Sequence, residues 1–374
     1  MRQALPNSHI PAVFCIVLAG FVLNHRRVFR RAIREPNELG GDWKVAWSKV
    51  LSFSDPFPYQ TNVRAADMRI FPTVKGEFRG QVTQIVMNEL WMQRFHENLA
   101  RVHKGTIRPG RKIFSFLSQV QPEVYHCGRL LSQGELIAED YEVQHVRTMG
   151  DFHFGCISLA PEELVRASKA IAGCEFDVER TKRSIRPSPD LMRRLLELHE
   201  TAERLAKTTP EFFEVPEITR AFEQQSIHVL IRCLTEGIVS TTNSGTLRKE
   251  SILARFEEFL EANPNSPLYL TEVCAAVGVA ERTLRFACEE HVGMGPIRYL
   301  NLRRMHLVRR ALVRALPSTV TVTRIATDHG FWELGRFAVA YRTLFGETPS
   351  ETLKRPPDNQ RDFPNRPLLL QRSS

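Results

Sequence analysis

Hydrophobic and polar positions follow two different patterns along the 374-residue chain. From Trp43 to about Leu164, short apolar runs alternate with turn signals such as Pro109-Gly110 and Gln133-Gly134. These runs include residues 84–87, 113–117 and 142–146. Several short strands at such spacing predict an antiparallel barrel or sandwich for this part of the chain.

From Pro161 onward, the apolar positions recur with a helical period. Pro161 is followed by two glutamates, which are typical of a first helical turn. Apolar stripes then predict two long amphipathic helices, at about 189–207 and 217–236. Such stripes must be buried, either as cover for the β core or as a dimer seam. We favour the seam, with Leu230, Ile231 and Leu234 as the candidate dimer contacts.

Composition divides the chain into five segments. We expect a leader over residues 1–42 and a β-rich domain with its helices over 43–236. A Ser/Thr-rich flexible linker is expected over 237–249, a helical domain over 250–354, and a disordered tail over 355–374. The leader holds an uncharged apolar run, Ile10 to Leu23, which is shorter than the ~20 residues that span a bilayer. A disordered or buried leader, or residues upstream of the natural start, is expected there, and a short membrane anchor is the alternative.

The most specific pattern lies beyond the linker. Val273 and Cys274 stand on a short helix, Gly278 follows Cys274 by four residues, and Leu284 comes six later. A small residue lets two helices cross closely, Gly permits the sharp turn, and the apolar position anchors the second helix. This is the spacing of a helix-turn-helix unit.

The same unit recurs with Ala326, 52 residues after Cys274. Here Ile325 and Ala326 precede Gly330, and Phe337 is the inward anchor after a turn one residue longer. A long helix over 298–314 is predicted to join the two copies. Two copies of this spacing are strong evidence for helix-turn-helix units, whereas a single copy would be weak evidence.

The charge distribution points in the same direction. The chain carries a formal net charge of +9, and residues 248–356 hold 16 basic against 12 acidic side chains. From His291 to Thr327 there are seven arginines and no acid. A solvated face usually mixes both signs, so this stretch indicates phosphate contact. A solvated helix face is the alternative interpretation.

Residues 250–354 resemble the DNA-binding domain of the AraC/XylS family of bacterial transcription regulators. The resemblance rests on both units, on Gly293 to Tyr299, on the linking helix and on the closing run Phe345 to Ser350. It implies an α+β protein: a cupin-like β-barrel with a helical pair as sensor and dimerisation domain over 43–236, then an all-α domain of two helix-turn-helix units. It also implies a ligand-responsive, sequence-specific DNA-binding regulator.

In this reading, the second helix of each unit enters a major groove of DNA. The candidates for base contact are Glu281, Arg282, Thr283, Arg285, Trp332 and Arg336, of which Trp332 has packing against the long helix as its alternative. The candidates for phosphate contact are Arg298, Arg303, Arg304, Arg309 and Arg342. Ala280 stands where the family usually has a Ser N-cap.

The cysteines, the histidines and the search for enzyme motifs leave the interpretation as a DNA-binding regulator unchanged. Seven cysteines without a C-x-x-C pair indicate a reducing, cytoplasmic setting. His126, His145 and His153 lack the close H-x-H pair of a metal cupin, so we expect no metal and no cofactor beyond an unidentified small-molecule effector. No hydrolase, P-loop or dinucleotide motif occurs, so we expect no enzyme.

The expected partners are promoter DNA, RNA polymerase for an activator, and a second copy of the chain, but not a membrane. The alternatives are a membrane-tethered version of the regulator and a nucleic-acid enzyme such as a recombinase.

Overall fold

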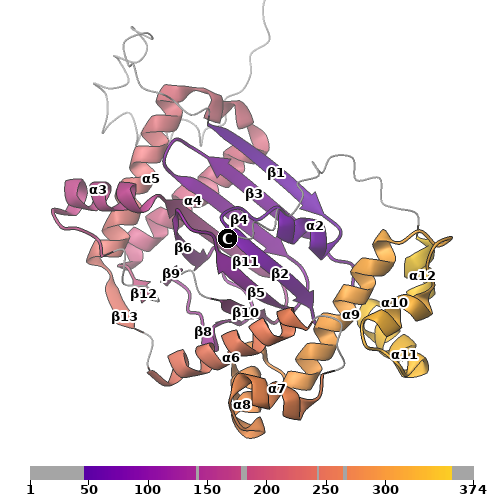
Figure 1. The fold of residues 1–374 in the computed structure, drawn as a ribbon. Coiled ribbons are helices and arrows are strands. Elements are labelled where there is room, and N and C mark those ends of the chain that lie inside the picture. Colours follow the sequence, from indigo (N-terminus) through magenta and orange to yellow (C-terminus); the bar gives the residue numbers. More distant parts are fainter. Residues whose placement is uncertain (1–45, 140–142, 178–182, 242–243, 264–267, 356–374) are drawn as a thin grey trace, which may run out of the picture.

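The computed structural model describes residues 46–139, 143–177, 183–241, 244–263 and 268–355 (Figure 1). Strands and helices up to residue 241 form what we term the N-terminal region, and the helices from residue 244 form the C-terminal region. The first is built mainly from antiparallel strands and the second from helices alone. The predicted α+β class is confirmed.

The strands form two antiparallel sheets. The larger has the order β1-β3-β4-β11-β6-β9-β12-β13 and the smaller the order β2-β5-β10-β7-β8. Their bounds are β1 Trp47–Phe53, β2 Ala66–Pro72, β3 Gly80–Val86, β4 Trp91–Glu97, β5 Arg101–Ile107, β6 Lys112–Leu117, β7 Val124–His126, β8 Arg129–Leu130, β9 Leu136–Ala138, β10 Gln144–Thr148, β11 Phe152–Leu159, β12 Arg183–Arg186 and β13 Ile238–Thr241. No strand pairing among the described residues joins the two sheets into a closed barrel.

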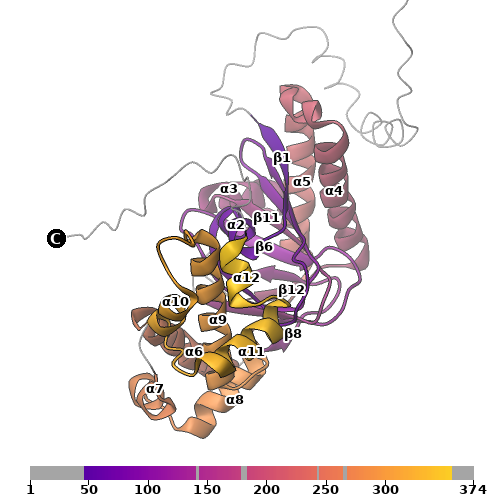
Figure 2. The ribbon, with the colours of Figure 1, turned by 90° about the vertical axis from the view of Figure 1, so that its right-hand side faces the viewer.

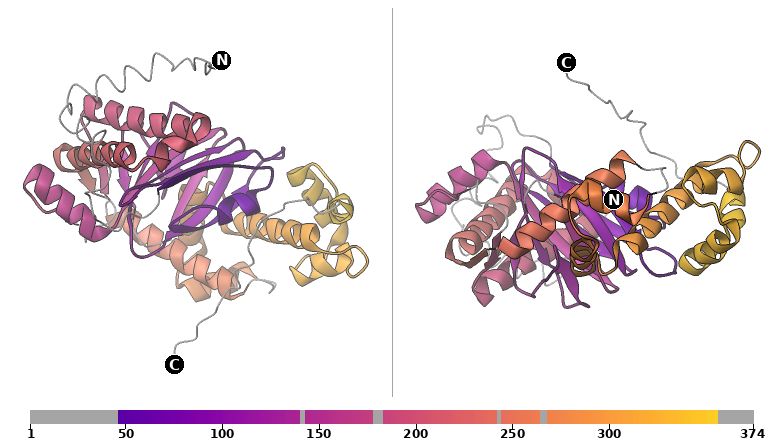
Figure 3. Two further views of the ribbon diagram at one scale, coloured as in Figure 1. Left: turned by 90° about the horizontal axis from the view of Figure 1, so that it is seen from above. Right: turned by 60° about the horizontal axis from the view of Figure 1, so that its bottom comes forward.

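Side-chain alternation determines what each face of a sheet contacts. On β4, Phe95 packs in the cluster between the two sheets, whereas Met92 packs in the cluster that includes the helices. On β5, Val102 faces away from the gap between the sheets and joins the core of the C-terminal region. Helices therefore cover the outer faces of both sheets, and the two regions share one core cluster (Figure 3).

The helical pair of the N-terminal region consists of α4, Pro189–Thr208, and α5, Pro216–Glu236, with α3, Pro161–Ala172, beside them (Figure 2). The short 3-10 helix η1, Pro210–Glu214, connects α4 to α5 along the chain. Both long helices begin and end close to the predicted bounds. The prediction of a dimer seam at Leu230, Ile231 and Leu234 is wrong, because these side chains are 0%, 0% and 3% exposed within the domain's own core. These three side chains pack in the cluster that the helices form with the larger sheet.

On both sides of residues 242–243, the segment predicted as a flexible linker forms regular secondary structure instead. Its first residues form β13, which pairs with β12 in register, for example Val239 with Ile185. The helix α6 then starts at Ser244. Backbone hydrogen bonds from a strand distant in sequence fix a segment whose composition alone indicates a loop. The apolar run Ile10–Leu23 and residues 356–374 lie outside the described residues.

The C-terminal region contains seven helices among the described residues: α6 Ser244–Ala262, α7 Leu270–Val277, α8 Glu281–Val292, α9 Pro296–Arg314, α10 Val322–Asp328, α11 Leu334–Phe345 and α12 Pro349–Lys354. The long α9 leads from the α6–α8 group, which lies against the sheets, to the α10–α12 group (Figure 1). Within the described part of the chain, no helix combines the length and the apolar character needed to cross a membrane.

Candidate nucleic-acid interface

The first predicted helix-turn-helix unit consists of α7 and α8. Gly278 ends α7 with a φ of 73°, the left-handed conformation that glycine adopts without strain. Val273 and Leu284 are buried, and Cys274 is half-buried against the same cluster. Ala280 occupies the N-cap of α8 and makes no side-chain capping bond. The second helix therefore begins without the hydrogen bond that a serine would supply.

The second unit consists of α10 and α11. Ile325, Ala326 and Phe337 are buried together, and Gly330 has a φ of 80° in the turn between the helices. The turn is longer than in the first unit, as the sequence indicates, because α11 starts only at Leu334. Both units thus fold around the residues predicted to form their cores.

The predicted base-contact residues are exposed: four lie on α8, Arg336 lies on α11, and Trp332 lies in the turn that precedes α11. Arg282 and Thr283 are exposed, and Arg285 forms an ion pair of 2.5 Å with Glu281 one helical turn away. In the second unit Arg336 pairs with Glu333 at 2.8 Å, and Trp332 is 68% exposed rather than packed on α9. Exposed pairs of this kind are weak, so a DNA phosphate or base can replace the carboxylate.

Two of the predicted phosphate contacts are buried instead. The side chain of Arg303 is 6% exposed and forms an ion pair with Glu257 on α6. Arg304 is 7% exposed, and its guanidinium lies beside Gly330, so that it connects α9 to the turn of the second unit. Neither side chain can reach a phosphate in this conformation, and the prediction for both is wrong.

Arg309 is also engaged within the protein. Its guanidinium lies 2.9 Å from a carboxylate oxygen of Asp55 and 3.5 Å from one of Glu347. By contrast, Arg298 and Arg342 are exposed and remain candidates for phosphate contact. The acid-free stretch of the sequence is thus partly neutralised by acids that lie far from it along the chain.

Glu257 is the centre of the contact between the two regions. Its carboxylate is buried and accepts a hydrogen bond from Tyr299 Oη at 2.6 Å. His145 Nε2 lies at 3.1 Å and Lys104 Nζ at 3.5 Å, in addition to Arg303. Burial raises the pKa of Glu257, but the charges of Arg303, His145 and Lys104 outweigh it and hold the pKa well below its usual range. This cluster could not be predicted from local sequence patterns, because its members come from the four elements β5, β10, α6 and α9.

A second group of charged side chains lies between the two sheets. Arg101 is 1% exposed and pairs with Glu97, which also accepts a hydrogen bond from Tyr59 at 2.8 Å. His126 lies 3.1 Å from Glu139; burial lowers the pKa of His126, but the charge of Glu139 raises it well above the ordinary value. A cavity of about 70 Å³ is lined by side chains of this group and by apolar residues of both sheets.

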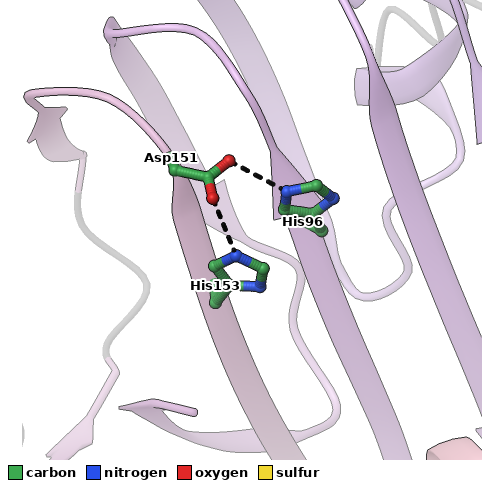
Figure 4. Close-up of side chains that lie close together, drawn as sticks. All are labelled: His96, Asp151 and His153. Atoms are coloured by element: carbon green, nitrogen blue, oxygen red, sulfur yellow. Dashed lines mark hydrogen bonds and ion pairs between the residues drawn. The ribbon is translucent and has the colours of Figure 1, made fainter. Parts of the chain in front are cut away.

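The structure does not bring the three histidines of the sequence analysis together. His126 faces the interior and His145 faces α6. His153 lies on the outer face of the larger sheet, next to His96 and Asp151 (Figure 4). His96 and Asp151 were not singled out from the sequence.

Comparisons with known proteins match the part of the chain that contains the two helix-turn-helix units. A family model described as a helix-turn-helix domain matches residues 273–355. The "XylDLEGF operon transcriptional activator 2" of Pseudomonas putida is 32% identical over 121 residues, or 31% of this chain and 77% of that protein. The "Probable thc operon regulatory protein" of Rhodococcus erythropolis is 40% identical over 100 residues, or 27% of this chain and 30% of that protein's length.

Among solved structures, a probable AraC family transcriptional regulator from Rhodopseudomonas palustris CGA009 is 35% identical, covers 27% of this chain and 94% of its own, and has a TM-score of 0.25. The AraC-like transcriptional activator CuxR is 16% identical, covers 75% of this chain and all of its own, and has a TM-score of 0.33.

Paired helix-turn-helix units on one linking helix define a class of DNA-binding domain. With the P. putida activator covered over 77% of its length, the chain belongs to the AraC/XylS family of transcription regulators.

Proposed function

We propose that the protein is a ligand-responsive transcription regulator that binds promoter DNA through α8 and α11. The observation that carries this proposal is the pair of helix-turn-helix units that α9 joins. The second helix of the first unit exposes Arg282, and that of the second unit exposes Arg336. Each second helix would occupy a major groove on the same face of the DNA, with the grooves ~34 Å apart. Arginine is the residue most often found in bidentate contact with guanine.

The N-terminal region is proposed to bind the effector between its two sheets. Buried charged side chains that line a cavity, here Arg101, Glu97 and Glu139, are typical of ligand sites. The present cavity of about 70 Å³ holds only a few water molecules, so an effector must separate the sheets or displace side chains.

Such a movement can reach the C-terminal region through β5 and β10. On β5, Arg101 and His103 line the cavity while Lys104 contacts Glu257 from the opposite face. On β10, Gln144 lines the cavity while His145 contacts the same carboxylate. A shift of either strand therefore changes the support of α6 and α9.

The wider assignments follow from this role. A regulator that binds promoter DNA acts in the compartment that holds the DNA, and as an activator it would contact RNA polymerase. A homodimer would bind two half-sites, with the second contact made intramolecularly, through a surface other than the buried side of α5. We propose no enzymatic activity for the chain.

Mapping of bound sites across the genome, followed by a shift assay with the full chain, tests the proposal. We expect salt-dependent binding to a small set of promoters, weakened selectively by Arg282→Ala. Binding without sequence preference, equally affected by any lost arginine, would favour a nucleic-acid enzyme. Cell fractionation separates the membrane-tethered alternative, which predicts recovery with the membranes.

A further inference from the structure

Three potential metal ligands lie on the outer face of the larger sheet, away from the cavity and from both helix-turn-helix units. They are His96 on β4, His153 on β11 and Asp151 just before β11 (Figure 4). One ligand atom of each lies within 4.8 Å of those of the other two. We propose that these three side chains form a binding site for a zinc ion.

The backbone determines this convergence. Asp151 and His153 are two residues apart, so their side chains leave the same face of the chain. His96 is the direct cross-strand partner of His153 in the register between β4 and β11. The neighbouring side chains Phe95 and Phe152 point to the opposite face, into the cavity wall. Two of the ligands are thus on paired strands of the sheet, and the third directly precedes one of these strands.

The side chains are oriented as a chelating group. The His96 Nε2 lies 3.0 Å from one oxygen of Asp151, and the His153 Nε2 lies 3.3 Å from the other. The two imidazole rings stack with centroids 4.3 Å apart and an angle of 18° between their planes. Both Nε2 atoms are therefore directed to the same carboxylate, where one divalent cation can replace the protons that the rings share with it.

The surroundings hold the site in place and leave it accessible. The backbone N–H of His153 donates to Gln121 Oε1 at 2.5 Å, and its carbonyl accepts from Gln121 Nε2 at 3.1 Å. The side chains of His96, Asp151 and His153 are 39%, 59% and 18% exposed, so an ion can enter from solvent.

The chemistry of the ligands selects the ion. Two imidazole nitrogens and one carboxylate oxygen suit Zn²⁺ and its neighbours in the first transition row, whereas Ca²⁺ and Mg²⁺ prefer oxygen ligands alone. Three protein ligands leave the fourth tetrahedral position to water on the exposed side. The ion would connect the ends of β4 and β11, whose other faces line the cavity.

Zinc titration of the full-length protein, after removal of bound metal with a chelator, tests the site. We expect one equivalent of zinc to bind, and His96→Ala or His153→Ala to weaken it about 10-fold or more. His228→Ala removes an exposed histidine of α5 and is the matched control, with affinity unchanged. The exposed Cys174 is replaced by Ser in every variant, so that its thiol does not contribute.

Two further measurements distinguish zinc binding at His96 and His153 from binding elsewhere in the protein. Zinc should raise the melting temperature of the parent protein but not of the His96→Ala, His153→Ala double variant, while both melt alike without metal. Bound Co²⁺ should show visible bands without thiolate charge transfer. Equal zinc affinity of the parent and the double variant, or a thiolate signature for the bound Co²⁺, would overturn the proposal.

Discussion

The Nε2 atom of His145 on β10 lies 3.1 Å from Oε1 of Glu257 on α6, and this contact crosses from the N-terminal to the C-terminal region. Lys104 on β5 and Arg303 on α9 share the same carboxylate. Two strands and two helices therefore meet at one buried acid. This side chain therefore helps to hold α6 and α9 against the smaller sheet.

We expect Glu257→Gln to destabilise the protein by about 3–5 kcal/mol, because it leaves Arg303 buried without its counter-charge. Lys104 keeps a second partner, Glu261. Chemical or thermal unfolding of the full chain measures the change. Glu258→Gln is the matched control, since Glu258 is exposed on the same helix, and it should alter stability by less than about 0.5 kcal/mol. Equal stability of the two variants would show that the cluster contributes nothing.

Acid should weaken the same contact. The pKa of Glu257 is depressed in the folded protein, so the stability it contributes is present above the ordinary glutamate pKa of about 4.3 and is lost as the pH falls through the folded value. We therefore expect the difference in stability between the wild type and Glu257→Gln to be full at neutral pH and to shrink below about pH 4. Unfolding measured over this range checks the sign, and a difference that grows in acid would contradict it.

The helices could be predicted because their signals are local. The glycines at 278 and 330, and the apolar positions at 284 and 337, define each unit within a few residues of sequence, and the structure follows them. The buried arginines could not be predicted in the same way. Asp55 and Glu257 neutralise Arg309 and Arg303 from 254 and 46 residues away, so a window of sequence shows only uncompensated positive charge.

Strand pairing accounts for the other features of the structure that the sequence does not predict. β13 is fixed by β12 across more than 50 residues of chain, which its own Ser/Thr-rich composition cannot indicate. His96 and His153 become neighbours only through the register of β4 and β11. A search for H-x-H within one strand misses a site whose third ligand is on the next strand. The D-x-H spacing at 151–153 was the one local sign of it.

Two exposed arginines should have separable effects on DNA binding. We expect Arg282→Ala to lose about 1–3 kcal/mol of discrimination at one base pair, because a bidentate base contact is removed. Arg298→Ala should weaken all sequences alike and reduce the slope of log K against log salt by about 0.9, the value for one phosphate contact. Binding of matched and mismatched duplexes at several salt concentrations measures both effects.

Arg303→Ala is the comparison for these two variants. Because Arg303 is buried against Glu257, its loss should lower the stability of the protein rather than the salt slope. A reduced salt slope in a variant that remains as stable as the wild type would restore Arg303 as a phosphate contact.

The last prediction concerns the inner face of α5. Leu230 and Leu234 are 0% and 3% exposed in the core of the N-terminal region. Replacing both with Asp removes about 2–5 kcal/mol of packing at each site and also places two carboxylates in an apolar core. Since a typical domain is stable by only about 5–15 kcal/mol, we expect the double variant to unfold or aggregate. Circular dichroism and sedimentation measure this outcome, with Gln224→Asp, His228→Asp as the control on the exposed face of the same helix. The control should remain folded, and a folded monomer from the Leu230→Asp, Leu234→Asp variant would show instead that these residues form the dimer contact.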